Sequence, residues 1–231
     1  MILVIILVGF NISRGGFSDP SKFLFDKLMI LPGIIIGLSF HEFAHAVVSY
    51  KLGDPTPKAQ GRVTLNPLAH IDVFGFFALL VAGFGWGKPV MIDDRYYKHP
   101  RSGKFLVSIA GVTMNFILAI LFAIIIKVII VYNHGYYVPG TGIDVVIEIL
   151  MNVVTINLVL MIFNLIPVPP LDGFNIVTEI FDLSRYSWYE TLYRNGFAIL
   201  MILILFNVTD IVLTPGIRFF YRLIFGMLGI Y

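Results

Sequence analysis

Four apolar stretches, each long enough to cross a lipid bilayer, constrain the fold of this chain more than any other feature. They cover residues 28–50, 105–131, 146–166 and 192–213. A helix needs about 20 apolar residues to cross the hydrocarbon layer, where the backbone must satisfy its own hydrogen bonds. The composition agrees, since 58% of the 231 residues are hydrophobic and 13% are charged. We therefore expect four transmembrane helices.

Two shorter apolar segments, residues 73–84 and 217–231, are weaker candidates that could be re-entrant or interfacial. The polar connections are too short to fold as separate soluble domains. We therefore expect an all-α, polytopic membrane protein that forms one integral membrane domain over residues 1–231. The opening stretch MILVIILVGF is short for a span, and no signal-peptide cleavage site follows it.

The charges of the connections predict the orientation of the helices, because Lys and Arg are retained on the cytoplasmic side. Segments 51–72 and 88–104 are rich in Lys and Arg, whereas segment 133–145 contains neither. The first two are therefore predicted inside and the third outside. Basic residues near the N-terminus fall outside under this scheme, against the rule, so the topology of the N-terminus stays open.

The first apolar run contains three ionisable side chains in the sequence HEFAH: His41, Glu42 and His45. Histidines four apart lie on one face of a helix, where both imidazoles can bind one ion. In an H-E-x-x-H motif the histidines bind Zn²⁺ and the glutamate takes a proton from the attacking water. His41 lies ten residues before Lys51, which is about 15 Å from the inner end of the helix. The site would therefore be submerged, on the cytoplasmic side of the bilayer centre.

A catalytic zinc usually has three protein ligands, so a third must come from elsewhere in the chain. The chain has no cysteine, and the other histidines lie in connections. Asp172 follows the helix that ends in NLIPVPPLDGF, whose prolines break the helix and allow the chain to turn back. Alone, Asp172 would be interpreted as a turn residue before Gly173. The missing zinc ligand favours Asp172 as the third.

Two asparagines, Asn157 and Asn164, share a face of the same helix and should point into the bundle. Asn164 is close enough in sequence to Asp172 to donate a hydrogen bond to an oxyanion that forms at the metal. A hydrogen bond between helices explains Asn164 equally well, and both roles stay open. Gly33 and Gly37 predict a close helix contact, for which the small residues of AGVTMN in residues 110–115 are a candidate partner.

Four motifs together resemble the site-2 proteases, which are intramembrane zinc metalloproteases: HEFAH, GRVTLNPLAHID, FGWGKPV and FNLIPVPPLDG. The resemblance is to the compact prokaryotic branch without PDZ or CBS domains and covers about residues 31–174. It implies His41, His45 and Asp172 as zinc ligands, Glu42 as general base and Asn164 as a helper in the transition state.

The same resemblance implies a location in the cell membrane, with several spans and an active site nearer the cytoplasm. It also implies the substrates, which would be transmembrane segments of other proteins, including regulators such as anti-sigma factors. An accessory membrane protein could admit the substrate. Because an unwound peptide is readily held at a strand edge, we further expect a short cytoplasmic-side β-hairpin made of residues 62–65 and 89–92.

Several other classes of function were weighed against this interpretation. The small, dispersed net charge of +2 does not fit a nucleic-acid surface. Bis-histidine haem ligation needs histidines on facing helices, and a purely structural polar network would leave the motif unexplained. A divalent-metal transporter and a catalytically inactive membrane scaffold remain as alternatives. Glu42 discriminates the transporter, because hydrolysis needs a base beside the reacting water and transport does not.

Overall fold

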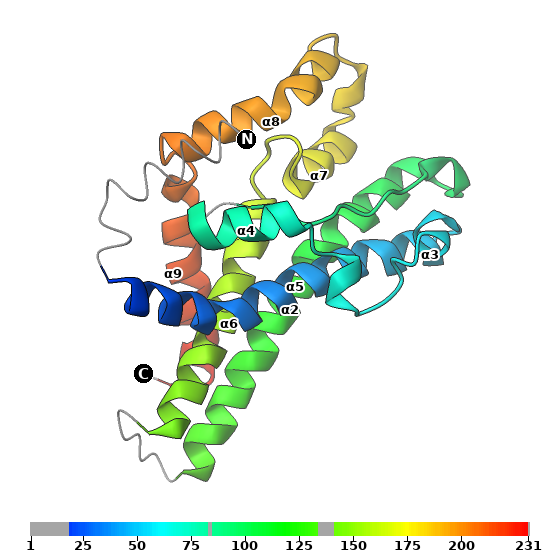
Figure 1. Cartoon of the computed structure of the whole chain (residues 1–231). Helices are drawn as coiled ribbons and strands as arrows, with labels where there is room; N and C mark the ends of the chain where they lie inside the picture. The colour runs from blue at the N-terminus through cyan, green and yellow to red at the C-terminus, as the bar shows by residue number, and fades with distance from the viewer. Residues whose placement is uncertain (1–18, 83–84, 134–140, 231) are drawn as a thin grey trace.

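The computed structural model describes residues 19–82, 85–133 and 141–230, and its regular elements are all helices (Figure 1). The helices are α2 (Pro20–Lys51), α3 (Thr56–Ala59), α4 (Val73–Ala82), α5 (Pro100–Tyr132), α6 (Gly142–Asn164), α7 (Asp172–Phe181), α8 (Tyr189–Leu205) and α9 (Asp210–Met227), with single 3₁₀ turns at Pro67–Ala69, Asp94–Tyr96 and Leu183–Arg185. The all-α expectation is confirmed for these residues. The opening stretch MILVIILVGF and most of segment 133–145 lie outside them.

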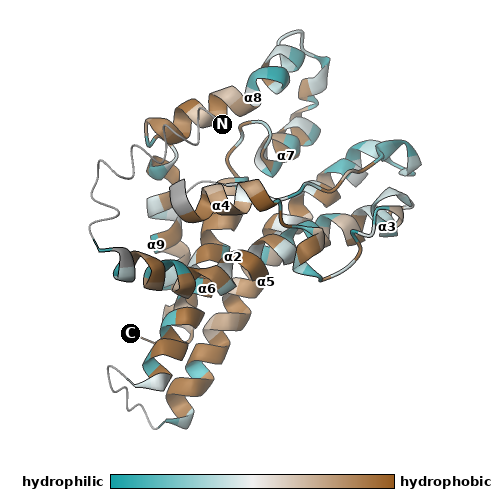
Figure 2. Ribbon diagram, viewed as in Figure 1, coloured by the Kyte–Doolittle hydropathy of each residue, from teal (hydrophilic) through white to brown (hydrophobic). Residues whose placement is uncertain are grey.

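Three helices, α2, α5 and α6, are long and apolar enough to cross a membrane. Figure 2 shows the hydrophobic surfaces of α5 and α6 running side by side toward the ends that flank residues 134–140. Their shared core includes Ala119, Ala123 and Ile126 from α5 and Val154 and Leu158 from α6. Many large apolar side chains of these helices are exposed, as expected for surfaces that face lipid rather than water.

The two glycines of α2 form a close helix contact, in which the nearest neighbours belong to α6 and Gly37 also meets Asn115 of the AGVTMN segment of α5. A Cβ at Gly33 would lie 3.1 Å from the Asn152 carbonyl oxygen, and one at Gly37 would lie 2.6 Å from Leu160 Cδ1. Small residues let the two helix backbones approach closely. The expected contact with AGVTMN is also present, because Asn115 of that segment donates to the Gly37 carbonyl at 3.1 Å, while Gly111 of the same segment meets the histidines.

The predicted fourth span over residues 192–213 is not a single straight helix. It is divided between α8 and α9, whose axes differ by 74°. The break lies after Phe206, and Asn207 adopts a positive φ of 55°. Asparagine tolerates this left-handed conformation, which ends a helix. Polar residues at the break, Asn207, Thr209 and Asp210, are followed at once by further apolar residues, so the run as a whole concealed the break.

Both weaker segments are helical. Segment 73–84 contributes α4, whose 10 residues extend about 15 Å and are too short to cross a bilayer. Segment 217–231 mostly belongs to α9, in which Ile224 and Phe225 are buried in the core formed with α5 and α6. This half of α9 therefore packs in the bundle and is not a separate interfacial segment.

The predicted hairpin is absent, because neither 62–65 nor 89–92 forms a strand. The two neighbourhoods are joined instead by the buried side chain of Arg62, which donates to the carbonyls of Ala69, Lys88 and Pro89. A single isolated antiparallel bridge pairs Ile71 with Gly87. A guanidinium that binds several carbonyls takes acceptors that a strand ladder would use. The segment after Gly87 is extended without pairing as a strand.

Candidate metal centre

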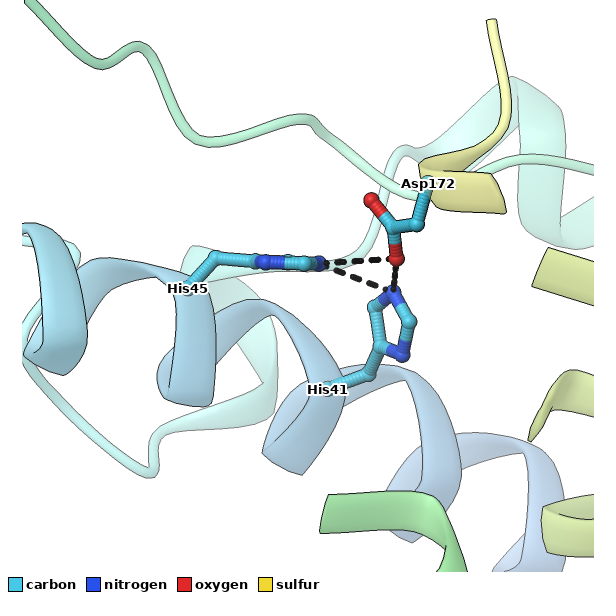
Figure 3. A group of neighbouring side chains, drawn as sticks. All are labelled: His41, His45 and Asp172. Carbon is cyan, nitrogen blue, oxygen red and sulfur yellow. Dashed lines mark hydrogen bonds and ion pairs between the residues drawn. The ribbon is translucent and has the colours of Figure 1, made fainter. Parts of the chain in front are cut away.

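Three side-chain atoms from two distant parts of the chain converge on one point (Figure 3). His41 Nε2 and His45 Nε2 are 3.0 Å apart, and Asp172 Oδ2 lies 3.2 Å and 3.3 Å from them. Both histidines project from successive turns of α2, while Asp172 opens α7. The histidines are almost completely buried, with exposed fractions of 5% and 9%.

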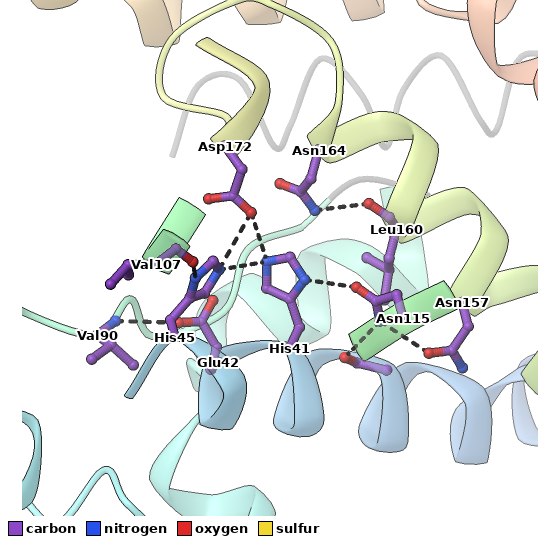
Figure 4. Close-up of polar contacts among 11 residues, drawn as sticks. His41, Glu42, His45, Val90, Val107, Asn115, Asn157, Leu160, Asn164 and Asp172 are labelled. Carbon is purple, nitrogen blue, oxygen red and sulfur yellow. Dashed lines mark hydrogen bonds and ion pairs between the residues drawn. The ribbon is translucent and has the colours of Figure 1, made fainter. Parts of the chain in front are cut away.

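Hydrogen bonds on the far side of each ring fix which nitrogen carries the proton. His45 Nδ1 lies 2.7 Å from the Val107 carbonyl, which can only accept. His41 Nδ1 lies 2.6 Å from Asn115 Oδ1, and the Asn115 amide orientation is set because its Nδ2 donates to Gly37 O and Asn157 Oδ1. Each Nδ1 therefore donates, and in the neutral form each ring presents an Nε2 lone pair toward Asp172 (Figure 4).

This arrangement fits a zinc ion. Two lone pairs and a carboxylate oxygen face each other, and the buried Asp172 Oδ2 has no hydrogen-bond donor, so a cation at their centre would relieve their repulsion. Zinc bonds to nitrogen and oxygen of about 2.0–2.2 Å in a tetrahedron place neighbouring ligand atoms about 3.3 Å apart. The measured separations of 3.0–3.3 Å match that spacing. Carbonyl and amide partners behind the histidines are typical of zinc sites.

The start of α7 is held where Asp172 can reach the histidines by a compact turn after α6. The chain leaves α6 at Asn164, turns through the proline-rich segment and returns as α7. Gly173 packs directly on the Leu165 carbonyl, and a Cβ there would overlap it. A glycine at this position is therefore required by the close approach.

Glu42 lies next to His41 on α2 and is partly buried. Its Oε2 accepts a hydrogen bond of 3.2 Å from the Val90 N–H, in the extended segment that Arg62 holds in place. One carboxylate oxygen is therefore fixed by the backbone, and the described contacts leave Oε1 without a donor.

The asparagines differ in how closely they are connected to the histidines. Asn164 Nδ2 donates to the Leu160 carbonyl of its own helix at 2.9 Å, and Figure 4 shows its side chain on the same side of His41 as Asp172. Asn157 is fully buried and contacts the site only through Asn115. Asn115 itself, which the sequence analysis did not single out, contacts His41 directly. Its signal was a polar residue inside an apolar run.

Comparisons with known proteins were made against protein-family models, curated proteins and solved structures. The family model Peptidase family M50 matches residues 29–206. The chain belongs to peptidase family M50, the site-2 protease family. The match covers α2, which carries both histidines, and α7, which carries Asp172.

The curated relatives of this M50 protease carry names of the same kind. "Putative zinc metalloprotease YwhC" of Bacillus subtilis is 38% identical over 199 residues, covering 84% of this chain and 90% of the relative. "Putative zinc metalloprotease Rip2" of Mycolicibacterium smegmatis is 24% identical over 212 residues, covering 89% of this chain and 75% of the relative. No solved structure matches. The chain is a membrane zinc metalloprotease, and the transporter alternative is set aside.

Gly111 of α5 leaves the space that the imidazoles of this M50 protease occupy. A Cβ there would lie 2.5 Å from both His45 Nε2 and His41 Cε1, and the rings cannot move without losing their hydrogen bonds. We expect Gly111→Ala to lower zinc affinity by at least about tenfold, the scale on which misoriented ligands act. Zinc titration of the purified protein measures this. Gly226→Ala, where a Cβ meets nothing within 4 Å, is the matched control and should bind like the wild type.

Asn115 acts as a positioning residue in this M50 protease, because it orients His41 without lying among the three converging atoms. We expect Asn115→Ala to weaken zinc binding by about 10–100-fold. Asn157→Ala also removes a fully buried asparagine but leaves the acceptor for His41 in place, so its effect on zinc affinity should be much smaller. Equal losses in zinc affinity for the two variants would mean that Asn115 contributes only to packing.

Proposed function

We propose that this chain hydrolyses peptide bonds within or near transmembrane segments of other membrane proteins. The observation that carries the proposal is the converging triangle of His41, His45 and Asp172, which is buried on an apolar helix long enough to cross a membrane. A bound zinc ion supplies a Lewis acid that polarises the scissile carbonyl and makes water acidic enough to react at neutral pH. His41, His45 and Asp172 would hold this ion.

Glu42 is the general base of the proposed reaction. With Oε2 held by the Val90 N–H, Oε1 is the oxygen that takes the proton from the attacking water. The same carboxyl then returns the proton to the departing amine, which is the step that releases the two peptide fragments. A positioned base of this kind contributes about 10²–10⁴-fold to a rate.

Asn164 is the proposed second catalytic residue. An asparagine amide has two N–H donors, and the Leu160 carbonyl uses one of them. The other can donate to the oxyanion that develops on the scissile carbonyl, which is the role inferred from the sequence. The hydrogen bond to Leu160 lies within α6 and is not the bond between helices that the structural role requires. The cleavage rate of Asn164→Ala with normal zinc content decides between the two roles.

The buried position of the site supports substrates that lie in the bilayer. An intact helix hides its peptide bonds in its own hydrogen bonds, so a substrate must unwind locally before it reaches Glu42. We place the protein in the cell membrane as a single multi-pass domain, with the site nearer the cytoplasm because the Lys- and Arg-rich connections flank it. Membrane-bound regulators such as anti-sigma factors, and an accessory membrane protein, fit this placement.

Cleavage of designed spans tests the proposed function. The purified protein is reconstituted in vesicles with single-span peptides, one all-leucine and one with glycine and asparagine in the inner half of the span. Mass spectrometry should locate cleavage inside the span of the second peptide only, because its helix unwinds more easily. A zinc chelator should abolish it. Cleavage confined to residues outside the bilayer would contradict the proposal.

A further inference from the structure

A polar stripe runs along the otherwise apolar bundle on the outer side of α9. Thr214, Arg218 and Arg222 follow one another at intervals of four and therefore share one helix face. We call these three residues the arginine face. Both arginines are exposed, and with Pro215, Phe219 and Leu223 the three residues line a hollow of about 560 Å³.

The packing of α9 places this face within the apolar length of α6. Gly216 faces Ile162 of α6, and the Tyr221 hydroxyl donates to Met151 Sδ at 3.3 Å. Residues later in α9 therefore contact residues earlier in α6. The two helices are antiparallel, as Figure 1 also shows. Counted from these two contacts, Arg222 lies level with residues 150–156, which is within the apolar run of α6.

Neither arginine forms an ion pair with an Asp or Glu in the described part of the chain. All 14 Asp and Glu residues lie in the described part of the chain, and the ion pairs found there include neither Arg218 nor Arg222. A charged side chain near the bilayer centre costs at least about 2.5–3.5 kcal/mol unless it is paired. Two guanidinium groups one helical turn apart concentrate this cost on one surface.

We propose that the arginine face docks a membrane-spanning helix of a partner protein that carries a carboxylate near its midpoint. A carboxylate at this depth pairs with guanidinium N–H groups in a bidentate manner, and the hollow beside Phe219 has room for side chains of the helix that carries it. Lipid phosphates are the other membrane anions, and they lie at the bilayer surfaces rather than within the apolar length of α6. The surface supplies no residue to the metal centre, so the partner differs from a substrate in the active site.

A pair of model helices tests this docking directly. A donor dye is attached at Gly226→Cys, one turn beyond Arg222 in open space, in a chain with no other cysteine. A leucine-rich 21-residue peptide with a central glutamate carries the acceptor dye, and a second peptide has glutamine at that position. In phosphatidylcholine nanodiscs, energy transfer should show the glutamate peptide binding at least about tenfold more tightly, the ratio expected for about 1.4 kcal/mol.

Removal of the two arginine charges from the protein should abolish the difference in affinity between the glutamate and glutamine peptides. Arg218→Gln combined with Arg222→Gln is expected to bind both peptides equally weakly while keeping wild-type zinc content. Arg185→Gln combined with Arg194→Gln, which removes two charges that are 77% and 71% exposed elsewhere, should keep the preference for glutamate.

Two results would overturn the proposal. One is that the wild-type protein binds the two peptides equally tightly. This comparison does not require any variant of the protein to fold. The other is that the wild type shows no preference for the glutamate peptide and instead carries bound acidic phospholipid, which the double variant at Arg218 and Arg222 loses. That result would identify the arginine face as a lipid site.

Discussion

Glu42→Gln should keep a full equivalent of zinc and lose about 10²–10⁴-fold of its cleavage rate. Glutamine has nearly the same shape and can still accept the Val90 hydrogen bond through its carbonyl oxygen, but it cannot take a proton from water. None of the three converging ligand atoms belongs to Glu42, so zinc content should not change. The two quantities are measured on the same sample, by elemental analysis and by cleavage of a reconstituted membrane substrate.

The matched control for this variant is Glu190→Gln, an exposed glutamate at the start of α8. It removes the same charge far along the chain from the site and should keep both zinc and activity. A Glu42→Gln protein that cleaves at the wild-type rate would rule out Glu42 as the base. A protein that loses its zinc would show that Glu42 holds the site together instead.

Asp172→Asn should lose zinc outright. The substitution preserves the size of the side chain but replaces an anionic oxygen with a neutral amide, so the two imidazoles are left without the charge that complements the ion. Its effect on zinc affinity should exceed the roughly 10–100-fold expected for an outer partner such as Asn115. Competition with a chelator of known affinity measures this loss.

Asp210→Asn, at the exposed start of α9, is the control for this second variant and should bind zinc normally. His41→Ala should behave like Asp172→Asn, since both remove one of three ligands. If Asp172→Asn kept wild-type zinc affinity, the third ligand would have to be another group, and the turn interpretation of Asp172 would stand.

The sequence predicted the residues that carry the chemistry of the site better than the residues that hold them in position. His41, Glu42 and His45 are adjacent on one helix, so a local motif was enough to propose them. Asp172 required a second argument, which combined the missing ligand with the helix break at the prolines. Both arguments use residues close together in the sequence: the spacing of histidines along one helix, and the prolines that end another.

Residues that support the site depend on contacts between helices, which periodicity does not encode. Asn115 and Gly111 come from α5 and meet the histidines only because α2 and α5 pack at one crossing point. The hairpin prediction failed for a related reason. Residues 62–65 contain bends instead of a strand, and the buried Arg62 binds the carbonyls of Lys88 and Pro89 with its side chain. No local pattern reveals that a surface-type residue will be buried.

The extent of the membrane-spanning part was also only partly predictable. Apolar length alone suggested a straight helix over residues 192–213, whereas one residue, Asn207, turns the chain between α8 and α9. Arg218 and Arg222 made α9 look interfacial, although its opposite face is buried against α5 and α6. A helix that is polar on one side and packed on the other has the same hydrophobic pattern at a membrane surface and inside a bundle.

The most direct test of the account is to locate zinc in the purified protein by anomalous X-ray scattering at the zinc absorption edge. A single strong peak is expected within about 2.0–2.2 Å of His41 Nε2, His45 Nε2 and a carboxylate oxygen of Asp172. A zinc peak bound without Asp172, or one at any other group of side chains, would contradict the metal centre proposed for this chain.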